Sequence, residues 1–276
     1  MKPRQFRLAL AFAAAIISPA FAAPGDAQFL LARDAFRAGD PQRLEKAAAS
    51  LGEHELYPYV EYFRLRMRLE QADDATIQSF LNRFEGSYAT EKMRGEWLQW
   101  LAKKERWSEV EAESAKLKAP EQDAQCLALQ ARLAKREAAA LDEVQRLWLS
   151  LLDPPEPCRL ALETLIWEKR VLANDVWERI RRQFEANKAS WARQTMAYLP
   201  LSQTPEEKQV AMLIDKPAFY LAKLPANWAA TRLGREMAAL AVQRVAASDP
   251  AAAAEALERI VGKLQDSERQ WAWSQI

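Results

Sequence analysis

The chain has 276 residues, half of them hydrophobic, and its 39 basic residues nearly balance its 38 acidic ones. A chain of this length can bury a substantial core in one large or two smaller units. Nucleic-acid binding normally produces a basic surplus or a basic stripe, so the balanced charge excludes that class of partner from further consideration.

Residues 1–22 have the pattern of a signal peptide. Three basic residues come first, an apolar core spans 8–17, and Ala20-Phe21-Ala22 is a small-residue cleavage site. The core has about half of the roughly 20 residues that a spanning helix needs, which argues against a retained anchor. Removing the three basic residues of 1–22 leaves 36 basic and 38 acidic residues, a net charge of −2. We expect a soluble periplasmic or secreted protein with no membrane span after cleavage.

The rest of the chain is predicted to be helical almost throughout. Apolar residues return at three- and four-residue steps, and the alternation typical of strands is nearly absent. Each apolar face lasts only three or four turns, so the helices should be short. Four such faces contain Met93, Trp97 and Leu101; Val144, Trp148 and Leu152; Val176, Ile180 and Phe184; and Leu257, Val261 and Leu264.

Helix starts are marked by a capping side chain followed by proline. The three clearest are Asp40-Pro41, Thr204-Pro205, where Glu207 is also placed to close a capping box, and Asp249-Pro250. Short polar turns between short helices imply antiparallel neighbours. A last helical pattern begins at Asp266.

About a dozen such helices could form a globular bundle or an open α-solenoid. Alanine runs at 47–49, 138–140 and 251–254 allow close helix packing, and no loop is long enough for an elaborate site. Residues 35–40 are similar to the helix-turn-helix ends of tetratricopeptide-like repeats, although no strict 34-residue period follows. We therefore predict an all-α fold, a degenerate tetratricopeptide-like solenoid or superhelix of antiparallel helices.

Cys126 and Cys158 are the only cysteines and lie 32 positions apart. With His54 as the single histidine, they cannot complete a common structural zinc set. A disulfide is favoured in an exported protein, and it would stabilise the fold by about 3 to 4 kcal/mol in the chain-entropy model. The alternative is a pair of buried, reduced thiols. Neither a metal nor a cofactor is expected.

The ten tryptophans could pack in the core or form platforms for sugar rings. Trp97, Trp148 and Trp177 fall on apolar helical faces, which favours core packing for most of the ten. Trp271 and Trp273 lie near the end of the chain, where the pattern does not distinguish the two roles.

Common catalytic motifs are absent from the sequence. It has no nucleophile elbow, phosphate-binding loop, dinucleotide-binding turn or zinc-protease helix. His54 lies in a polar run and is interpreted as an exposed loop residue. Glu109, Glu111 and Glu113 have i,i+4 partners nearby and are interpreted as a solvated helix surface.

One short segment combines three tyrosines and a proline in an unusual order. It reads Leu56-Tyr57-Pro58-Tyr59-Val60-Glu61-Tyr62. Further pieces follow in the order 97–101, Arg106-Trp107, Cys126, 147–149, a turn with proline, and Cys158. Together they resemble the early part of soluble lytic murein transglycosylases, periplasmic enzymes of peptidoglycan turnover. The resemblance is strongest between residues 30 and 170.

The resemblance implies a helical superhelix that closes into a ring and precedes a lysozyme-like catalytic domain. It also implies a disulfide between Cys126 and Cys158. In that family a catalytic-domain glutamate cleaves the β-1,4 bond between N-acetylmuramic acid and N-acetylglucosamine and leaves 1,6-anhydromuramoyl ends. The implied partners are therefore peptidoglycan glycan strands.

The chain departs from the family because the motifs of the catalytic domain are missing. Glu113-Ser114 is the only Glu-Ser pair, and it is interpreted as a coincidence within the helical array. We expect residues 23–276 to be the N-terminal part of the ring-forming superhelix, cut from a longer enzyme, with no catalytic residue and no activity alone. Its remaining partners would be the missing superhelix and the catalytic domain.

The alternative is a self-standing, non-catalytic periplasmic helical-repeat protein that mediates protein-protein interactions. The reading frame beyond Ile276 distinguishes the two hypotheses. In both, Pro58 suits the first turn of a helix, and Tyr59 and Tyr62 then share one face. We expect this pair of tyrosines to pack against a neighbouring helix rather than to bind sugar.

Overall fold

A computed structural model describes residues 25–276, so the predicted signal peptide and its cleavage site lie outside the described residues. The described residues form sixteen α-helices and five 3-10 helices without a strand, which confirms the predicted all-α fold and exceeds the expected dozen helices. None of these helices is long and apolar enough to cross a membrane. The chain divides into two compact units, and the boundary between them lies after Met93.

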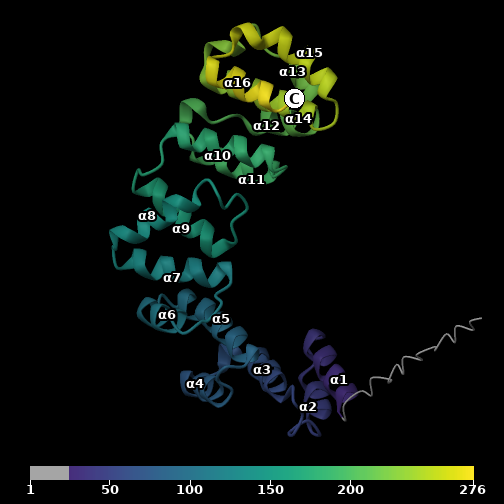
Figure 1. Cartoon of the computed structure of the whole chain (residues 1–276), viewed down its shortest axis with the longest axis vertical. Coiled ribbons are helices and arrows are strands. Elements are labelled where there is room, and N and C mark those ends of the chain that lie inside the picture. Colours follow the sequence, from purple (N-terminus) through teal and green to yellow (C-terminus); the bar gives the residue numbers. More distant parts are fainter. Residues whose placement is uncertain (1–24) are drawn as a thin grey trace, which may run out of the picture. The chain divides into compact units, whose positions relative to one another are not determined.

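The first unit is built from helical hairpins (Figure 1). Helix α1 packs on α2 and α3, and α3 packs on α4. The predicted start at Asp40-Pro41 is confirmed, because Asp40 accepts the backbone N–H of Arg43 at 2.9 Å. Asp73 caps the fourth helix in the same way through Thr76. The helices are α1 (Asp26–Arg37), α2 (Pro41–Ala48), α3 (Tyr57–Met67), η1 (Leu69–Gln71), α4 (Asp74–Arg83) and the start of α5 (Tyr88–Lys103).

The second unit, residues 94–276, continues as successive packed helices (Figure 1). Helix α7 packs on α6, α8 and α9, α10 packs on α11, and α14 packs on α10, α12, α13, α15 and α16. The α-helices that follow α5 are α6 (Trp107–Ser114), α7 (Gln122–Ala134), α8 (Ala138–Leu147), α9 (Glu156–Trp167), α10 (Ala173–Glu185), α11 (Ala189–Thr195), α12 (Glu207–Asp215), α13 (Pro217–Ala222), α14 (Arg232–Ala246), α15 (Pro250–Ile260) and α16 (Asp266–Ser274). The 3-10 helices are η2 (Met196–Tyr198), η3 (Leu201–Gln203), η4 (Trp228–Ala230) and η5 (Val261–Lys263).

Helix α14 is the central element of the last helices. Its residues from Glu236 to Ala246 are buried apart from Arg244, and it contacts two apolar clusters at once. Gly234 lies in its first turn, where a Cβ atom would collide with the backbone carbonyl of Trp228. Glycine therefore allows η4 to approach the helix closely.

Three expected helix boundaries need correction. Thr204 does not cap a helix: its hydroxyl instead donates to the carbonyls of Leu199 and Pro200, and α12 begins at Glu207, two residues after the expected first position at Pro205. The apolar face ending at Leu152 is interrupted, since α8 ends at Leu147. The face ending at Leu264 is also broken, because α15 gives way to a 3-10 turn after Ile260.

The tryptophans divide between core and surface. Trp97, Trp148 and Trp177 are buried as predicted, and Trp228 joins them. Trp271 is half-buried, whereas Trp273 is 42% exposed. Core packing is therefore confirmed for Trp97, Trp148 and Trp177, but it does not apply to all ten tryptophans.

Candidate functional site

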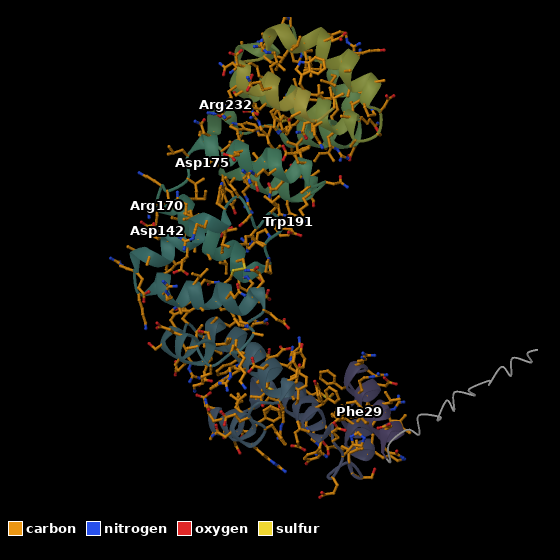
Figure 2. The ribbon with its side chains drawn as sticks, viewed as in Figure 1. Phe29, Asp142, Arg170, Asp175, Trp191 and Arg232 are labelled. Atoms are coloured by element: carbon orange, nitrogen blue, oxygen red, sulfur yellow. A yellow bond between two sulfur atoms is a disulfide. The ribbon has the colours of Figure 1, made fainter. Side chains whose placement is uncertain are left out.

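The tyrosine-rich segment forms the start of α3. Leu56 is the N-cap residue and Pro58 lies in the first turn, where proline needs no helical partner for its nitrogen. Tyr62 is buried, with its ring 6.1 Å from that of Phe36 in α1. Tyr59 lies 6.5 Å from Phe29, the residue labelled in Figure 2. These aromatic contacts join α3 to α1.

The polar residues of the same segment form a local network. The hydroxyl of Tyr57 is hydrogen-bonded to Glu61, and this bond, together with burial, raises the pKa of the phenol. Glu61 is ion-paired with Arg64 at 2.5 Å. Arg64 also holds Glu45 of α2 through two bonds of 2.9 and 2.6 Å. The segment therefore links α3 to α2 as well as to α1.

His54 is not an exposed loop residue, so that prediction is wrong. Only 6% of its side chain is exposed, and its ring stacks on Phe29. Its Nδ1 accepts the backbone N–H of Leu56 at 3.1 Å, so the ring proton of the neutral form lies on Nε2, 3.2 Å from an Asp26 carboxylate oxygen. The histidine therefore joins the start of α3 to the start of α1.

Cys126 of α7 and Cys158 of α9 form a disulfide with both residues fully buried. The Gln130 side chain adds a second link between these helices by donating to the Pro157 carbonyl at 2.7 Å. Gln122, one turn before Cys126, approaches the disulfide through its side-chain amide, which lies 3.7 Å from the Cys126 sulfur. The bond therefore fixes the two helices and the position of Gln122.

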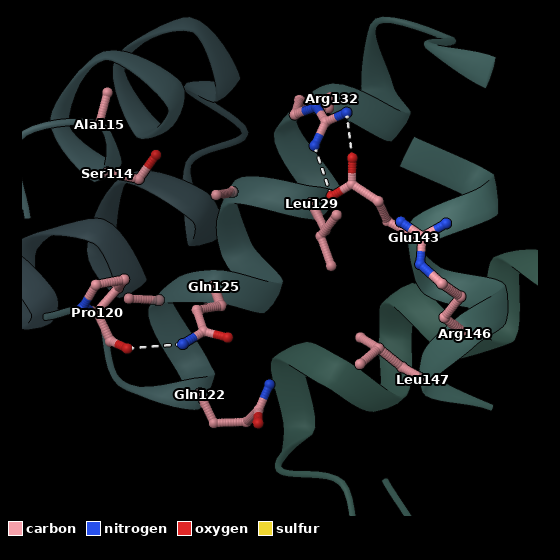
Figure 3. A pocket seen from close by; sticks show the side chains of 12 residues that line it. Ser114, Ala115, Pro120, Gln122, Gln125, Leu129, Arg132, Glu143, Arg146 and Leu147 are labelled. Carbon is pink, nitrogen blue, oxygen red and sulfur yellow. Dashed lines mark hydrogen bonds and ion pairs between the residues drawn. The ribbon is translucent and has the colours of Figure 1, made fainter. Parts of the chain in front are cut away.

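Gln122 also lines a groove beside the disulfide, which we call the α6–α8 groove (Figure 3). It has a volume of about 500 Å³ and is bordered by α6, α7 and α8. Arg132 spans it, holding Glu143 at 2.8 Å and Glu137 at 2.9 Å. The amide of Gln125 is already used by the Pro120 carbonyl. No aromatic ring lines the groove, so it lacks a platform for stacking a sugar.

The electrostatics of Glu143 do not favour a role as a general acid. The hydrogen bond from Arg132 is the main cause that lowers the pKa of its carboxyl, and the charges of Arg132 and Arg146 act in the same direction. A general acid for glycosidic oxygen needs a raised pKa and must hold its proton near neutral pH. Glu143 is therefore poorly suited to protonate a glycosidic oxygen.

The Glu113-Ser114 pair is equally unsuited to catalysis. Glu113 is 5% exposed, so the interpretation of this residue as solvated surface is wrong. Its carboxylate is paired with the buried guanidinium of Arg94 and, at 2.6 Å, with Lys116. The Ser114 hydroxyl donates to the Glu111 carbonyl. The carboxylate and the hydroxyl are therefore both engaged in contacts within the fold.

Two further buried carboxylates were not identified from the sequence. Glu236 of α14 is bound by Arg181 of α10 and by Arg232, and Glu268 of α16 is bound by Arg235 of α14. The arginine partners Arg181 and Arg235 lie 55 and 33 positions away, so local spacing could not reveal them. The only sequence signal is the presence of Glu236 just before the apolar run of α14. Both pairs connect helices rather than form a reaction centre.

Residues 25–276 contain no cluster of three or more histidine, cysteine, aspartate or glutamate residues that could hold a metal ion. Ion pairs elsewhere join successive helices at the surface. Asp142 of α8, for example, lies 2.5 Å from Arg170, which follows α9 (Figure 2). The described side chains thus provide grooves and links between helices, and Glu113, Glu143, Glu236 and Glu268 are each held by arginine or lysine.

Comparison with known proteins adds the decisive structural observation. No protein-family model matches the sequence, and no curated protein matches it significantly. Three solved structures match 90 to 91% of the chain with TM-scores of 0.59 to 0.63. The chain has the fold of part of a soluble lytic transglycosylase.

The first of these structures is the 70-kDa soluble lytic transglycosylase in complex with bulgecin A, with 20% identity and a TM-score of 0.63. The second is the 70-kDa enzyme of Escherichia coli, with 19% identity and a TM-score of 0.62. The third is an inactive mutant of the lytic transglycosylase Slt of Pseudomonas aeruginosa, with 21% identity and a TM-score of 0.59. The chain spans 40 to 41% of the length of these proteins.

Proposed function

We propose that this chain is a scaffold portion of an exported lytic transglycosylase. The reaction of the whole enzyme would cleave the β-1,4 bond between N-acetylmuramic acid and N-acetylglucosamine and leave 1,6-anhydromuramoyl ends. The observation that carries the proposal is the correspondence of 91% of the chain with soluble lytic transglycosylases, over 41% of their length. The disulfide between Cys126 and Cys158 supports it, because the sequence resemblance implies this bond.

The proposed role of the chain is to position peptidoglycan strands and to support a catalytic domain formed by residues outside it. The ion-paired state of Glu113 and Glu143 supports this division of labour. The helix-to-helix links through Cys126, Arg64 and Glu236 support a rigid scaffold rather than a flexible linker. The basic-apolar-small pattern of 1–22 supports export to the periplasm.

A binding experiment tests the proposal. The protein is expressed with its own residues 1–22, recovered from the periplasmic fraction, and mixed with purified insoluble peptidoglycan. We expect it to sediment with the peptidoglycan and not with insoluble cellulose, which tests for general adhesion to polysaccharide. Retention in the cytoplasm, or equal sedimentation with both polymers, would count against the proposal.

A second candidate function, a non-catalytic helical-repeat protein that binds other proteins, is favoured by one observation. Leu160 and Trp167 lie seven residues apart on α9 and are 44% and 83% exposed. Exposed tryptophan is typical of protein interfaces. This candidate predicts no retention on peptidoglycan and a periplasmic complex that Trp167→Ala weakens, whereas the first candidate predicts retention that this substitution leaves unchanged.

A further inference from the structure

A second groove lies in the first unit, between α3 and α4, and we call it the α3–α4 groove. It has a volume of about 430 Å³ and a mainly polar lining. Helix α3 contributes Glu61, Arg64 and Arg68. Helix α4 contributes Ser79 and Arg83, together with the residues of its first turn. All of these residues belong to one compact unit, so the groove does not depend on the second unit.

The charges in the groove are not balanced. Three arginines and two carboxylates line it, and Arg64 is ion-paired both with Glu61 of the lining and with Glu45 outside it. Arg68 and Arg83 are exposed, and neither guanidinium has a carboxylate partner among residues 25–276. The opposing charge is Asp73, whose oxygen is occupied by the N–H of Thr76 at 2.7 Å in the cap of α4. The groove therefore presents more positive than negative charge to a ligand.

Of the two arginines without a carboxylate partner, Arg83 is the better oriented to bind a ligand. Its guanidinium carbon lies 5.7 Å from the centre of the Tyr57 ring and 5.0 Å from that of Phe84. Packing against aromatic faces restricts the rotation of the guanidinium while its N–H groups remain available. A planar guanidinium presented in this way suits a carboxylate, which it can bind through two parallel hydrogen bonds.

The two free arginines mark opposite ends of the groove. Arg68 comes just before the turn that leads into α4, and Arg83 is the last residue of α4. Because Arg83 lies over Tyr57 at the start of α3, the two helices run antiparallel. Ten residues of helix at 1.5 Å each place the two positions about 15 Å apart, which equals roughly four to five residues of extended peptide.

We propose that the α3–α4 groove binds a short, extended acidic peptide, with one carboxylate at Arg83 and another at Arg68. The Ser79 hydroxyl lines the groove between these ends and is available to a backbone amide or carbonyl. The identity of the peptide rests on the proposed function: the stem peptides of peptidoglycan are short and rich in carboxylates. The groove would then hold the peptide side of the polymer rather than its sugar chain.

A titration with the whole mature protein tests this inference. The probe is a fluorescent stem tetrapeptide, and its anisotropy reports binding. We expect Arg83→Gln to weaken binding about tenfold or more, because one bidentate charged contact is lost. Arg68→Gln should weaken binding less, since Asp73 lies at that end of the groove. The affinity of Arg83→Lys should fall between those of the wild type and Arg83→Gln, because lysine keeps the positive charge but cannot form two parallel hydrogen bonds.

Arg37→Gln is the matched control, because Arg37 is an exposed arginine of the same unit that does not line the groove. It should bind like the wild type, and circular dichroism should show that all variants are folded. A tetrapeptide with amidated carboxyl groups should bind about tenfold more weakly than the parent peptide.

Equal affinities for the wild type, Arg83→Gln and Arg68→Gln would overturn the inference. So would binding of glycan strands stripped of their peptides when the tetrapeptide does not bind. Neither result would touch the proposed function as long as the protein still sediments with intact peptidoglycan. Loss of that sedimentation in the wild type would instead overturn the proposed function.

Discussion

At the scale of single residues, Arg179 of α10 is a charged side chain whose burial must be compensated by hydrogen bonds. It is 3% exposed, and burial lowers its pKa to about 10. Its guanidinium donates to the carbonyls of Trp148 and Leu151 and lies 4.8 Å from the centre of the Trp148 ring. The charge is thus stabilised by carbonyl groups that follow the end of α8, where a helix favours a cation.

Replacing Arg179 with leucine should lower the free energy of unfolding by about 2 to 4 kcal/mol, because two buried carbonyl groups lose their donor. Urea denaturation measures the change. Arg182→Ala is the control on the same helix: its side chain is 46% exposed and paired with Glu178, so its loss should cost under about 1 kcal/mol. Similar losses of unfolding free energy for the two variants would contradict the stabilising role assigned to the hydrogen bonds of Arg179.

Two tyrosines should make the free energy of unfolding depend on pH in the alkaline range. Burial raises the pKa of Tyr198 and of Tyr220 to about 12, and Tyr198 also donates to Glu163 at 2.8 Å. An unfolded tyrosine ionises near pH 10, so the unfolded state releases these protons first. The contribution of both residues is therefore complete below about pH 10 and is lost as the pH rises to about 12.

Absorbance at 295 nm follows this ionisation. We expect Tyr198 and Tyr220 to ionise only as the protein unfolds, because their pKa values are raised in the folded state. Tyr198→Phe should flatten the loss of stability above pH 10, whereas Tyr88→Phe should not. Ionisation of all six tyrosines near pH 10 in the folded protein would refute the assignment.

At the scale of elements, helix α14 shows how one glycine sets a packing distance. Gly234→Ala should lower the free energy of unfolding by about 3 kcal/mol or more, because the new methyl group meets the backbone of Trp228. Gly95→Ala in α5 is the control: nothing lies within 4 Å of its added Cβ, so better helix propensity should stabilise the protein by up to about 1 kcal/mol. Thermal unfolding distinguishes the two, and a neutral effect of Gly234→Ala would contradict the close approach of η4.

The disulfide between α7 and α9 gives a second prediction at this scale. Replacing Cys126 and Cys158 with serine opens a loop of 32 residues and should cost about 3 to 4 kcal/mol of unfolding free energy in the chain-entropy model. Reductant should destabilise the wild type by a similar amount and leave the double variant unchanged. Equal unfolding free energies of the oxidised wild type and the double variant would show that the bond contributes nothing.

The sequence predicts elements better than it predicts what lies between them. The period of Val176, Ile180 and Phe184 identified α10, since side chains on one buried face recur with the helical period. Thr204 failed as a cap because two carbonyls of the preceding turn compete for its hydroxyl. His54 and Glu113 were placed on the surface because their partners, Phe29 and Arg94, are distant in sequence.

The two grooves could not be predicted from the sequence for the same reason: the residues that form them are distant in sequence. Each combines residues of adjacent helices, and the free charge of Arg83 becomes evident only once Arg64 is seen to occupy Glu61. The tyrosine-rich segment gave the family resemblance without indicating a site. In the structure the rings of Tyr59 and Tyr62 pack on α1 and that of Tyr57 lies against Phe84, and only Glu61 of the segment lines the α3–α4 groove.

At the scale of the whole molecule, the chain consists of two compact units of packed helices, held internally by aromatic contacts, ion pairs and one disulfide. Over 91% of its length this arrangement matches 41% of a soluble lytic transglycosylase. The scaffold that we propose needs polar grooves and stable links between helices, and it needs no proton donor. The ion-paired Glu113 and Glu143 fit that requirement.

The central claim is that this chain holds peptidoglycan without cleaving it. The most direct test is mass spectrometry of the soluble products after the mature protein is incubated with intact peptidoglycan, with the bound fraction measured in the same tubes. The account predicts retention of the protein on the polymer and no 1,6-anhydromuropeptides above the buffer control. Release of 1,6-anhydromuropeptides by this chain alone would contradict it.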